Sequence, residues 1–287
     1  MKIDGETRLA GVLGWPVAHS RSPRLHNYWL ERYGINGVYL PLPVRPEHFS
    51  EAVRALVRLG FAGANVTVPH KEAAFALCDS FDENARKAGA ANTLVFSPAG
   101  EIAGSNTDGF GFIEALKAGA PGFEARKGPA VVLGAGGSAR AIVQALIDMG
   151  APEIRLVNRT ADRAERLAEV LGGSVKVVRW TAALTALAGA NLLVNTTSLG
   201  MKGQPPLALD LAPLPTRATV NDIVYSPLET GLLRTAKARG NPVVDGLGML
   251  LHQARAGFCA WFGRDPEVTD ALRRHVAADL LAEAERA

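Results

Sequence analysis

One lysine in the chain has a setting that suits proton exchange with a bound molecule. Lys71 ends the segment 63–71, in which residues that favour a β-strand precede a proline. Because proline is favoured at a helix start, we expect Lys71 in or near the first turn of the next helix. The partial positive charge of that turn disfavours an ammonium group, so the amine could exchange a proton with a substrate. A surface lysine that only begins a helix is the alternative.

One aspartate could pair with this lysine. Asp108 follows the polar run 104–107 and precedes apolar residues at helical spacing. Aspartate is a good helix N-cap, and capping alone would explain it. A carboxylate held ionised at a helix start could also form a dyad with Lys71, in which each group shapes the other's proton affinity.

Hydroxyl and amide side chains occur near the ends of two early strands. Asn65 and Thr67 are two positions apart and face the same side of a strand. Ser20 and Ser22 lie on the loop after a strand at 9–14, where Ser22 before Pro23 also fits a helix N-cap. Paired hydroxyls could receive a carboxylate or a polyol.

A glycine-rich turn predicts a dinucleotide site. Residues 134–139 read G-x-G-x-x-A between a strand at 129–133 and a helix at 140–149, and a second strand follows at 153–157. Gly134 makes the turn, Gly136 lets the backbone approach a pyrophosphate, and Ala139 allows close packing of helix on strand. The amides at the helix start suit the phosphates.

The end of the second strand favours NADP over NAD. An NAD protein usually carries an acidic residue there, whereas this chain has Asn158, Arg159 and Thr160, with Arg163 one turn later. Two guanidinium groups suit a 2′-phosphate, because they form charge-assisted and bidentate hydrogen bonds. The alternative is a solvated helix start.

Strands alternate with helices along both halves, which predicts an α/β fold with mainly parallel sheets. In the first half we expect strands at 9–14, 38–44, 63–68 and 90–96, with the proline-containing 38–44 at an edge. In the second half they follow at 129–133, 153–157, 175–178, 191–195, 218–224 and 241–244, after a linker at 119–128. The loop after 191–195 should border the cofactor. Helices at 247–262 and 268–284 should return to the first domain or bridge both.

Composition narrows the class of protein. A chain of 287 residues suggests two domains, and a net charge of +3 without a basic run makes nucleic acid a poor partner. No segment reads as a signal peptide or a membrane span, so a cytoplasmic protein is the default. Cys78 and Cys259 are expected to be free thiols, and His19 and His26 match no metal-ligand spacing.

A series of motifs in order resembles the shikimate dehydrogenase family across essentially the whole chain. They are S-x-S (Ser20, Ser22), N-V-T-V-P-x-K (65–71), A-N-T (91–93), N-T-D-G (106–109), G-A-G-G-S-A-R (134–140), N-R-T (158–160), N-T-T-S-x-G-M (195–201), D-x-V-Y-x-P-L-x-T (222–230) and D-G-x-x-M-L-x-x-Q-A (245–254). His70 departs from the pattern, since the family often has Phe there.

The resemblance implies an enzyme of two α/β domains. Residues 1–110 with 247–287 would form the substrate-binding and catalytic domain, and 111–246 a Rossmann-type NADP-binding domain. The implied reaction is the reversible NADPH-dependent reduction of 3-dehydroshikimate to shikimate in aromatic amino-acid biosynthesis, with Lys71 and Asp108 as the catalytic pair and no metal. Around the substrate it implies Ser20, Ser22, Thr67, Lys71, Asn92, Asp108, Tyr225 and Gln253. Along the cofactor it implies Gly134, Ala135, Gly136, Gly137, Ser138, Asn158, Arg159, Thr160, Arg163, Ile223 and Gly246, with Glu83 and Met249 as weaker candidates.

Two other functions stay open at this point. One is a quinate/shikimate dehydrogenase that uses NAD, against which Arg159 and the serine pair argue. The other is a non-catalytic NADP-binding regulator, against which the retention of Lys71 and Asp108 argues. The sequence also leaves open whether the chain forms a homodimer.

Overall fold

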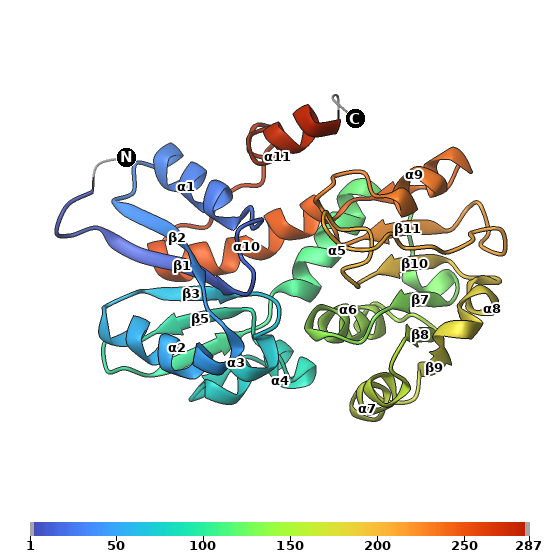
Figure 1. Ribbon diagram of the computed structural model, residues 1–287, viewed down its shortest axis with the longest axis horizontal. Coiled ribbons are helices and arrows are strands. Elements are labelled where there is room, and N and C mark those ends of the chain that lie inside the picture. The colour runs from blue at the N-terminus through green and yellow to red at the C-terminus, as the bar shows by residue number, and fades with distance from the viewer. Residues whose placement is uncertain (1–2, 285–287) are drawn as a thin grey trace. The chain divides into compact units, whose positions relative to one another are not determined.

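The computed structural model describes residues 3–284 (Figure 1). The chain divides into two compact units, Met1–Asp108 with Leu250–Ala278, and Gly109–Met249 with Asp279–Ala287. The sequence placed the boundaries after residues 110 and 246 and assigned the whole C-terminal segment to the first unit. The last stretch from Asp279 instead groups with the second unit.

The first unit is built on a six-stranded sheet in the order β2-β1-β3-β5-β6-β4. Strand β1 is parallel to β2 and β3, and β4 is parallel to β6, while β5 is antiparallel to β3 and β6. Strand β2 lies at the edge, as its prolines predicted. The strands are β1 (Arg8–Gly14), β2 (Gly37–Pro43), β3 (Gly63–Val66), β4 (Ser80–Phe81), β5 (Thr93–Phe96) and β6 (Ile102–Ser105).

The strand predictions of the first half need correction. Strand β3 ends at Val66, so that Thr67 and Val68 leave the sheet and the Val68 side chain is exposed. Strands β4 and β6 were not predicted, because each is short and carries too few large apolar residues to show a period of two.

Helices of the first unit cover the sheet and include the C-terminal segment. They are α1 (Ser22–Arg32), α2 (Phe49–Arg58) after a 3₁₀ turn (Pro46–His48), α3 (Lys71–Leu77), α4 (Glu83–Ala88), most of α10 (Gly246–Phe262) and the start of α11 (Asp270–Ala284). The expected return of the C-terminal segment is confirmed, since Trp261 Nε1 donates to the Leu94 carbonyl at 2.9 Å. Trp29 Nε1 donates likewise to Glu267 at 3.0 Å.

The start of α1 differs from the prediction. The N-cap position belongs to Arg21, whose side chain makes no capping hydrogen bond, and Ser22 is already helical. Pro23 lies in the first turn, as predicted. The Ser22 hydroxyl therefore has no capping role, and its side chain lies beside the Tyr39 phenol, whose pKa it lowers.

The second unit has a fully parallel six-stranded sheet in the order β12-β11-β10-β7-β8-β9. Numbered from β7, this is the 3-2-1-4-5-6 order of the dinucleotide-binding fold, and all six predicted strands are confirmed. The strands are β7 (Ala130–Leu133), β8 (Ile154–Asn158), β9 (Val175–Arg179), β10 (Leu192–Asn195), β11 (Thr219–Asp222) and β12 (Val243–Val244).

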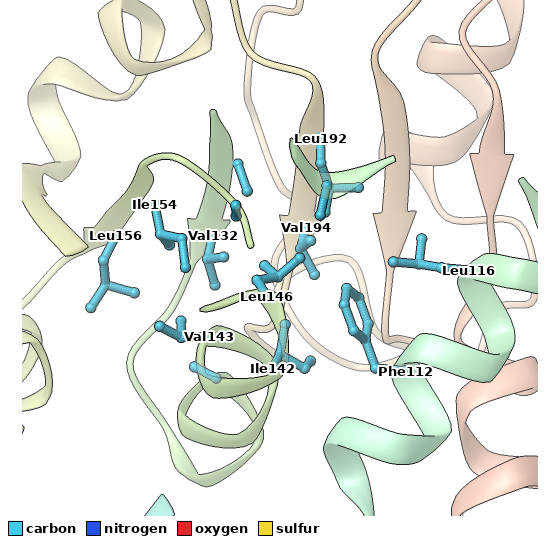
Figure 2. Close-up of a cluster of buried hydrophobic side chains, with 14 of the residues drawn as sticks. Phe112, Leu116, Val132, Ile142, Val143, Leu146, Ile154, Leu156, Leu192 and Val194 are labelled. Carbon is cyan, nitrogen blue, oxygen red and sulfur yellow. The ribbon is translucent and has the colours of Figure 1, made fainter. Parts of the chain in front are cut away.

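Helices pack on this sheet through a hydrophobic core. Figure 2 shows Val132 and Val194 of the neighbouring strands facing Ile142 and Leu146 of α6, with Phe112 of α5 beside them. Each fully buried side chain of this size contributes about 1.5–3 kcal/mol. The helices are α5 (Asp108–Gly119), α6 (Gly137–Asp148), α7 (Ala161–Leu171), α8 (Ala183–Leu187) and α9 (Gly231–Ala238), with 3₁₀ turns at Ala125–Lys127 and Trp180–Ala182.

The expected linker at 119–128 is part of this core. Ala120 and Ala125 are buried in it, and Gly119 is the last residue of α5. The glycine- and charge-rich composition of this segment suggested a linker, although Ala120 and Ala125 pack in the core.

Within residues 3–284, none of the helices is both long and apolar enough to cross a bilayer. The same residues contain no group of His, Cys, Asp and Glu side chains with metal-binding geometry.

Candidate functional site

The predicted dyad forms a buried ion pair in the first unit. Lys71 is the first residue of α3, as predicted, and its Nζ contacts Asp108 Oδ2. Lys71 is 9% exposed and Asp108 only 2%. Asp108 begins α5, and its carboxylate is engaged by Lys71 and Asn92. Because an unpaired buried charge is costly, each group requires the other.

The Asn92 amide joins two more predicted residues. Asn92 Nδ2 lies 2.7 Å from Asp108 Oδ1 and 2.7 Å from Gln253 Oε1. Thr107 Oγ1 also lies 3.0 Å from this nitrogen, which carries two hydrogens, and the two acceptors at 2.7 Å are the closer ones. The structure thus brings Lys71, Asn92, Asp108 and Gln253 together, although α10 supplies Gln253 from far along the chain.

Thr107 and Asn106 fix the start of α5, and sequence reasoning gave neither a role of its own. The Thr107 hydroxyl donates to the Gln253 carbonyl at 2.9 Å, and its N–H donates to Asn92 Oδ1 at 3.0 Å. Asn106 accepts from the Asp108 N–H at 3.1 Å and donates to the Ala90 carbonyl at 2.8 Å. The available signal was the run N-T-D-G, in which every side chain before the glycine is polar.

The predicted hydroxyl residues follow the carboxyl ends of β1 and β3. The Ser22 N–H donates to Ser20 Oγ at 3.3 Å, which ties the serine loop to the start of α1. Thr67 donates its N–H to the Leu13 carbonyl at 2.9 Å, immediately after β3. Ser22 is buried, whereas Ser20 and Thr67 are half-buried and keep access to solvent.

His70 supports α3 and takes no part in the dyad. Its Nε2 lies 2.8 Å from the Val44 carbonyl, and its ring stacks on Phe49 at 4.5 Å. Burial lowers the pKa of the His70 imidazole, against the bond to Val44, which raises it. The histidine therefore fills the aromatic position while adding one backbone contact.

In the second unit, the glycine turn has the shape that a pyrophosphate needs. Gly134 has φ +106°, and a Cβ there would lie 2.6 Å from Thr196 Oγ1, on the loop after β10 that was expected to border the cofactor. Gly136 is the N-cap of α6, and a Cβ there would meet nothing within 4 Å. The first amides of an α-helix are not used by its own backbone, and here they begin beside this open space. The turn fits a dinucleotide.

The remaining turn residues are arranged around this helix start. Ala135 is buried, while Gly137 and Ser138 are half-buried in the first turn of α6.

The predicted 2′-phosphate residues follow β8. Asn158 Nδ2 donates to the Thr160 carbonyl at 2.8 Å and so shapes the turn into α7. Arg159 is exposed in this turn, and Arg163 is exposed in the first turn of α7. Thr160 is the N-cap by position, without a side-chain capping bond. Two guanidinium groups at one strand end can bind a phosphate by donating hydrogen bonds to its oxygens.

Other cofactor candidates have distinct settings. Gly246 lies against Ile223, and a Cβ on Gly246 would overlap the Ile223 carbonyl. Met249 is buried in the core of the second unit. Glu83 is exposed on α4 of the first unit and pairs with Lys87 at 3.0 Å. Tyr225 is half-buried on the loop after β11.

Asp222 is a buried carboxylate that sequence reasoning used only as part of a motif. It accepts hydrogen bonds from Asn195 Nδ2 (2.9 Å), the Val224 N–H (3.0 Å) and the Thr230 hydroxyl (2.7 Å). Burial raises its pKa to about 6, and the three hydrogen bonds oppose the rise. Asp222 thereby holds the loop after β10 and the loop after β11, and the second of these carries the predicted residues Ile223 and Tyr225.

Comparison with known proteins matches both units. A model described as the shikimate dehydrogenase substrate binding domain matches residues 12–94, and one described as shikimate / quinate 5-dehydrogenase matches 120–201. Shikimate dehydrogenase (NADP(+)) of Paramagnetospirillum magneticum is 62% identical over 96% of this chain and 99% of its own length. The enzyme of that name from Acidiphilium cryptum is 59% identical over 98% and 100%.

Solved structures of dehydrogenases match the fold over nearly the whole chain. Shikimate 5-dehydrogenase from Thermus thermophilus, in complex with NADP(H) and shikimate, has a TM-score of 0.84 at 39% identity and covers 96% of this chain and 100% of its own. Quinate dehydrogenase from Corynebacterium glutamicum, in complex with NAD, has a TM-score of 0.86 at 31% identity and covers 95% and 99%.

Proposed function

Because the chain belongs to the shikimate dehydrogenase family, we propose that it catalyses the reversible NADPH-dependent reduction of 3-dehydroshikimate to shikimate. The observation that carries this proposal is the buried Lys71–Asp108 pair, flanked by the amides of Asn92 and Gln253. A non-catalytic protein would have no need to keep an ion pair at the cost of burying two charges.

Lys71 is the acid–base group. NADPH supplies the hydride when bound, while the protein supplies position and charge. The Lys71 ammonium gives a proton to the substrate's carbonyl oxygen, and the amine takes it back in the reverse direction. Asp108 orients the neighbouring hydroxyl of the substrate and keeps Lys71 in place through the ion pair.

Neutral polar side chains recognise the rest of the substrate. Hydroxyls and amides pair with the substrate's hydroxyls and carboxylate, and an unmatched partner would leave a buried polar group without a bond. The residues assigned to this role are Ser20, Ser22, Thr67, Asn92, Tyr225 and Gln253.

The cofactor is held by backbone and by cations. The first amides of α6, at Gly137 and Ser138, hold the pyrophosphate, and the open space at Gly136 admits it. Arg159 and Arg163 hold the 2′-phosphate, which makes NADP the preferred cofactor. Ile223 and Gly246, which lie against each other, are also assigned to the cofactor, with Met249 and Glu83 as secondary candidates.

The decisive experiment follows oxidation of the cofactor at the nicotinamide absorbance band. Shikimate and quinate are each offered with NADP and with NAD, and the four kcat/KM values are compared. We expect shikimate with NADP to exceed the other three combinations. Quinate with NAD is the pair suggested by the Corynebacterium glutamicum structure, and a preference for it would make the chain a quinate/shikimate dehydrogenase. If no combination turns over while NADP binds, the regulator interpretation holds.

The setting of the enzyme is part of the proposal. We assign it to the cytoplasm, where NADPH and a biosynthetic pathway are available, and we leave nucleic acid out of its partners. Sedimentation at several concentrations distinguishes a homodimer from a monomer.

A further inference from the structure

A continuous row of buried polar side chains crosses the first unit and ends on Asp108. Tyr39 Oη lies 2.7 Å from Asn65 Oδ1, and Asn65 Nδ2 lies 3.1 Å from Thr93 Oγ1. Thr93 Oγ1 lies 3.1 Å from Asn92 Oδ1, and Asn92 Nδ2 lies 2.7 Å from Asp108 Oδ1. All five residues are at most 5% exposed. We call this set the Tyr39–Asp108 row.

The direction of every hydrogen bond in the row is fixed by its neighbours. Asn65 Nδ2 also lies 3.1 Å from the Asn92 carbonyl, which can only accept, so this end of the Asn65 amide must be the donor. Asn92 Oδ1 lies 3.0 Å from the Thr107 N–H, which can only donate, so this end of Asn92 must be the acceptor.

The two hydroxyls follow from these assignments. Tyr39 meets the acceptor end of Asn65 and must donate to it. Thr93 accepts a hydrogen bond from Asn65 and therefore donates its own hydrogen to Asn92. Every donor in the row thus points toward the Asp108 carboxylate, without relying on how the amide ends were assigned.

The beginning of the row stays neutral. Burial raises the pKa of the Tyr39 phenol well above 10, although a hydrogen bond from Ser22 lowers it, so the phenol keeps its proton. The His26 ring stacks on Tyr39 at 4.0 Å with an interplanar angle of 8°. Burial lowers the pKa of His26 to about 3, so the imidazole adds no charge.

At the other end of the row, the Asp108 carboxylate has a charged neighbour in Lys71 and a neutral one in the Asn92 amide. The same Asn92 amide also donates to Gln253. Hydrogen bonds in series polarise one another, and more strongly in a dry interior than in water. The row therefore delivers a strengthened donor to the carboxylate oxygen that Lys71 leaves available.

We propose that Tyr39, Asn65 and Thr93 are positioning residues for the reaction, because they hold the Asn92 amide against Asp108 and Gln253. The part of this proposal that concerns turnover rests on the proposed function. The side chain of Ser22, a predicted substrate residue, lies beside Tyr39, so the row extends between two groups of substrate residues that lie far apart in the sequence.

The test removes single hydroxyls without changing shape. Tyr39→Phe and Thr93→Val each break the row at one bond, and each should lower kcat roughly 2- to 20-fold, from the usual worth of a buried hydrogen bond and its unpaired partner. KM for NADPH should not change. Thr93→Ser keeps the hydroxyl and should restore kcat. Tyr28→Phe is the matched control, since Tyr28 contacts His275 and lies outside the row.

A second readout does not depend on turnover. The Asn92 side-chain amide should give a slowly exchanging NMR signal, assigned by its loss in Asn92→Asp, and exchange should accelerate in Tyr39→Phe and Thr93→Val. The double variant should cost little more than either single variant, because both open the same row.

The proposal is overturned if both variants fold and show wild-type kcat and unchanged exchange at Asn92. It is also overturned if Thr93→Ser is as impaired as Thr93→Val, because the hydroxyl would then have no role. If Tyr39→Phe does not fold, the Thr93 pair carries the test. Absence of turnover in the wild type would count against the proposed function alone, since the exchange measurement still reports on the row.

Discussion

At the scale of single residues, the site depends on charges that are matched in different ways. Lys71 is paired inside the first unit, where solvent is largely excluded. Arg159 is exposed at the end of β8 and has a ligand phosphate as its expected counterion. Removing the Lys71 side chain should therefore affect kcat, whereas removing the Arg159 side chain should affect the affinity for NADP.

Lys71→Ala should lower kcat by a factor on the order of 10² to 10⁴, the usual worth of a general acid or base. KM for NADPH should be little changed. The measurement is steady-state kinetics on protein whose circular dichroism spectrum matches that of the wild type. Lys117→Ala, which removes an exposed lysine from α5, is the control. A kcat close to wild type would remove Lys71 from the mechanism.

Arg159→Ala should weaken NADP binding by roughly 1.5–3 kcal/mol, because a hydrogen bond to a charged group is lost. NAD lacks the 2′-phosphate, so its affinity should stay the same. Titration of cofactor fluorescence gives both dissociation constants. Arg166→Ala, on the exposed side of α7, provides the comparison. An equal loss for NAD and NADP would show that Arg159 acts on the turn and not on the phosphate.

At the scale of elements, the loops after parallel strands carry many of the candidate residues, and buried polar groups hold these loops in shape. Asp222 fastens the loops after β10 and β11, and the glycine turn connects β7 to α6. The sequence identified the turn from its motif. The role of Asp222 needed the structure, because its partner Asn195 lies 27 positions away, at the end of another strand.

The raised pKa of Asp222 predicts how stability depends on pH. The folded state binds a proton up to about pH 6, whereas the unfolded chain releases it near 3.8. The contribution of Asp222 to the free energy of unfolding is therefore fully present below pH 3.8 and is lost as the pH rises to about 6. The difference between the two pKa values corresponds to about 3 kcal/mol.

Asp222→Asn mimics the protonated acid, since the amide can donate to the Thr230 hydroxyl and its oxygen still accepts from Val224. We expect the variant to lose this pH dependence. The unfolding free energy of the variant minus that of the wild type should therefore increase between pH 4 and pH 6. Urea unfolding across this range measures the gain. Parallel pH curves for the two proteins would contradict the assignment.

Two substitutions in the glycine turn should have opposite effects. Gly134→Ala strains a residue at φ +106° and crowds Thr196, so it should lower the melting temperature. Gly136→Ala meets no neighbouring atom and has φ −91°, so the protein should fold normally. The added methyl group should nevertheless block the pyrophosphate and weaken NADP and NAD alike. Unchanged affinity in Gly136→Ala would argue against a pyrophosphate at this helix start.

At the scale of the whole molecule, the distribution of charge predicts weak binding to nucleic acid. The net charge of +3 is scattered, and the sequence has no run of lysine and arginine. Phosphate contacts dominate DNA affinity, so binding to duplex DNA should be no tighter than roughly 10⁻⁶ M at physiological salt. A fluorescence titration checks this, and tight, salt-sensitive binding would contradict it.

The sequence by itself determined the architecture of the second unit and the identity of most candidate residues. Buried parallel strands read as short apolar runs, and glycine and proline mark turns that few other residues can make. These signals are local, so they can be recognised in the sequence without knowledge of the fold. The same reasoning missed β4 and β6, whose pairing rests on neighbours and not on their own composition.

Only the tertiary structure decided which polar groups meet. Asn92 and Gln253 are 161 positions apart and share a hydrogen bond, and the sequence holds no spacing that predicts it. The structure likewise showed that Ser22 is not the helix cap, which was one interpretation of it, and that Asp108 pairs with Lys71. A buried polar side chain takes the partner that the fold brings within about 3 Å, and folding, not local propensity, sets that distance.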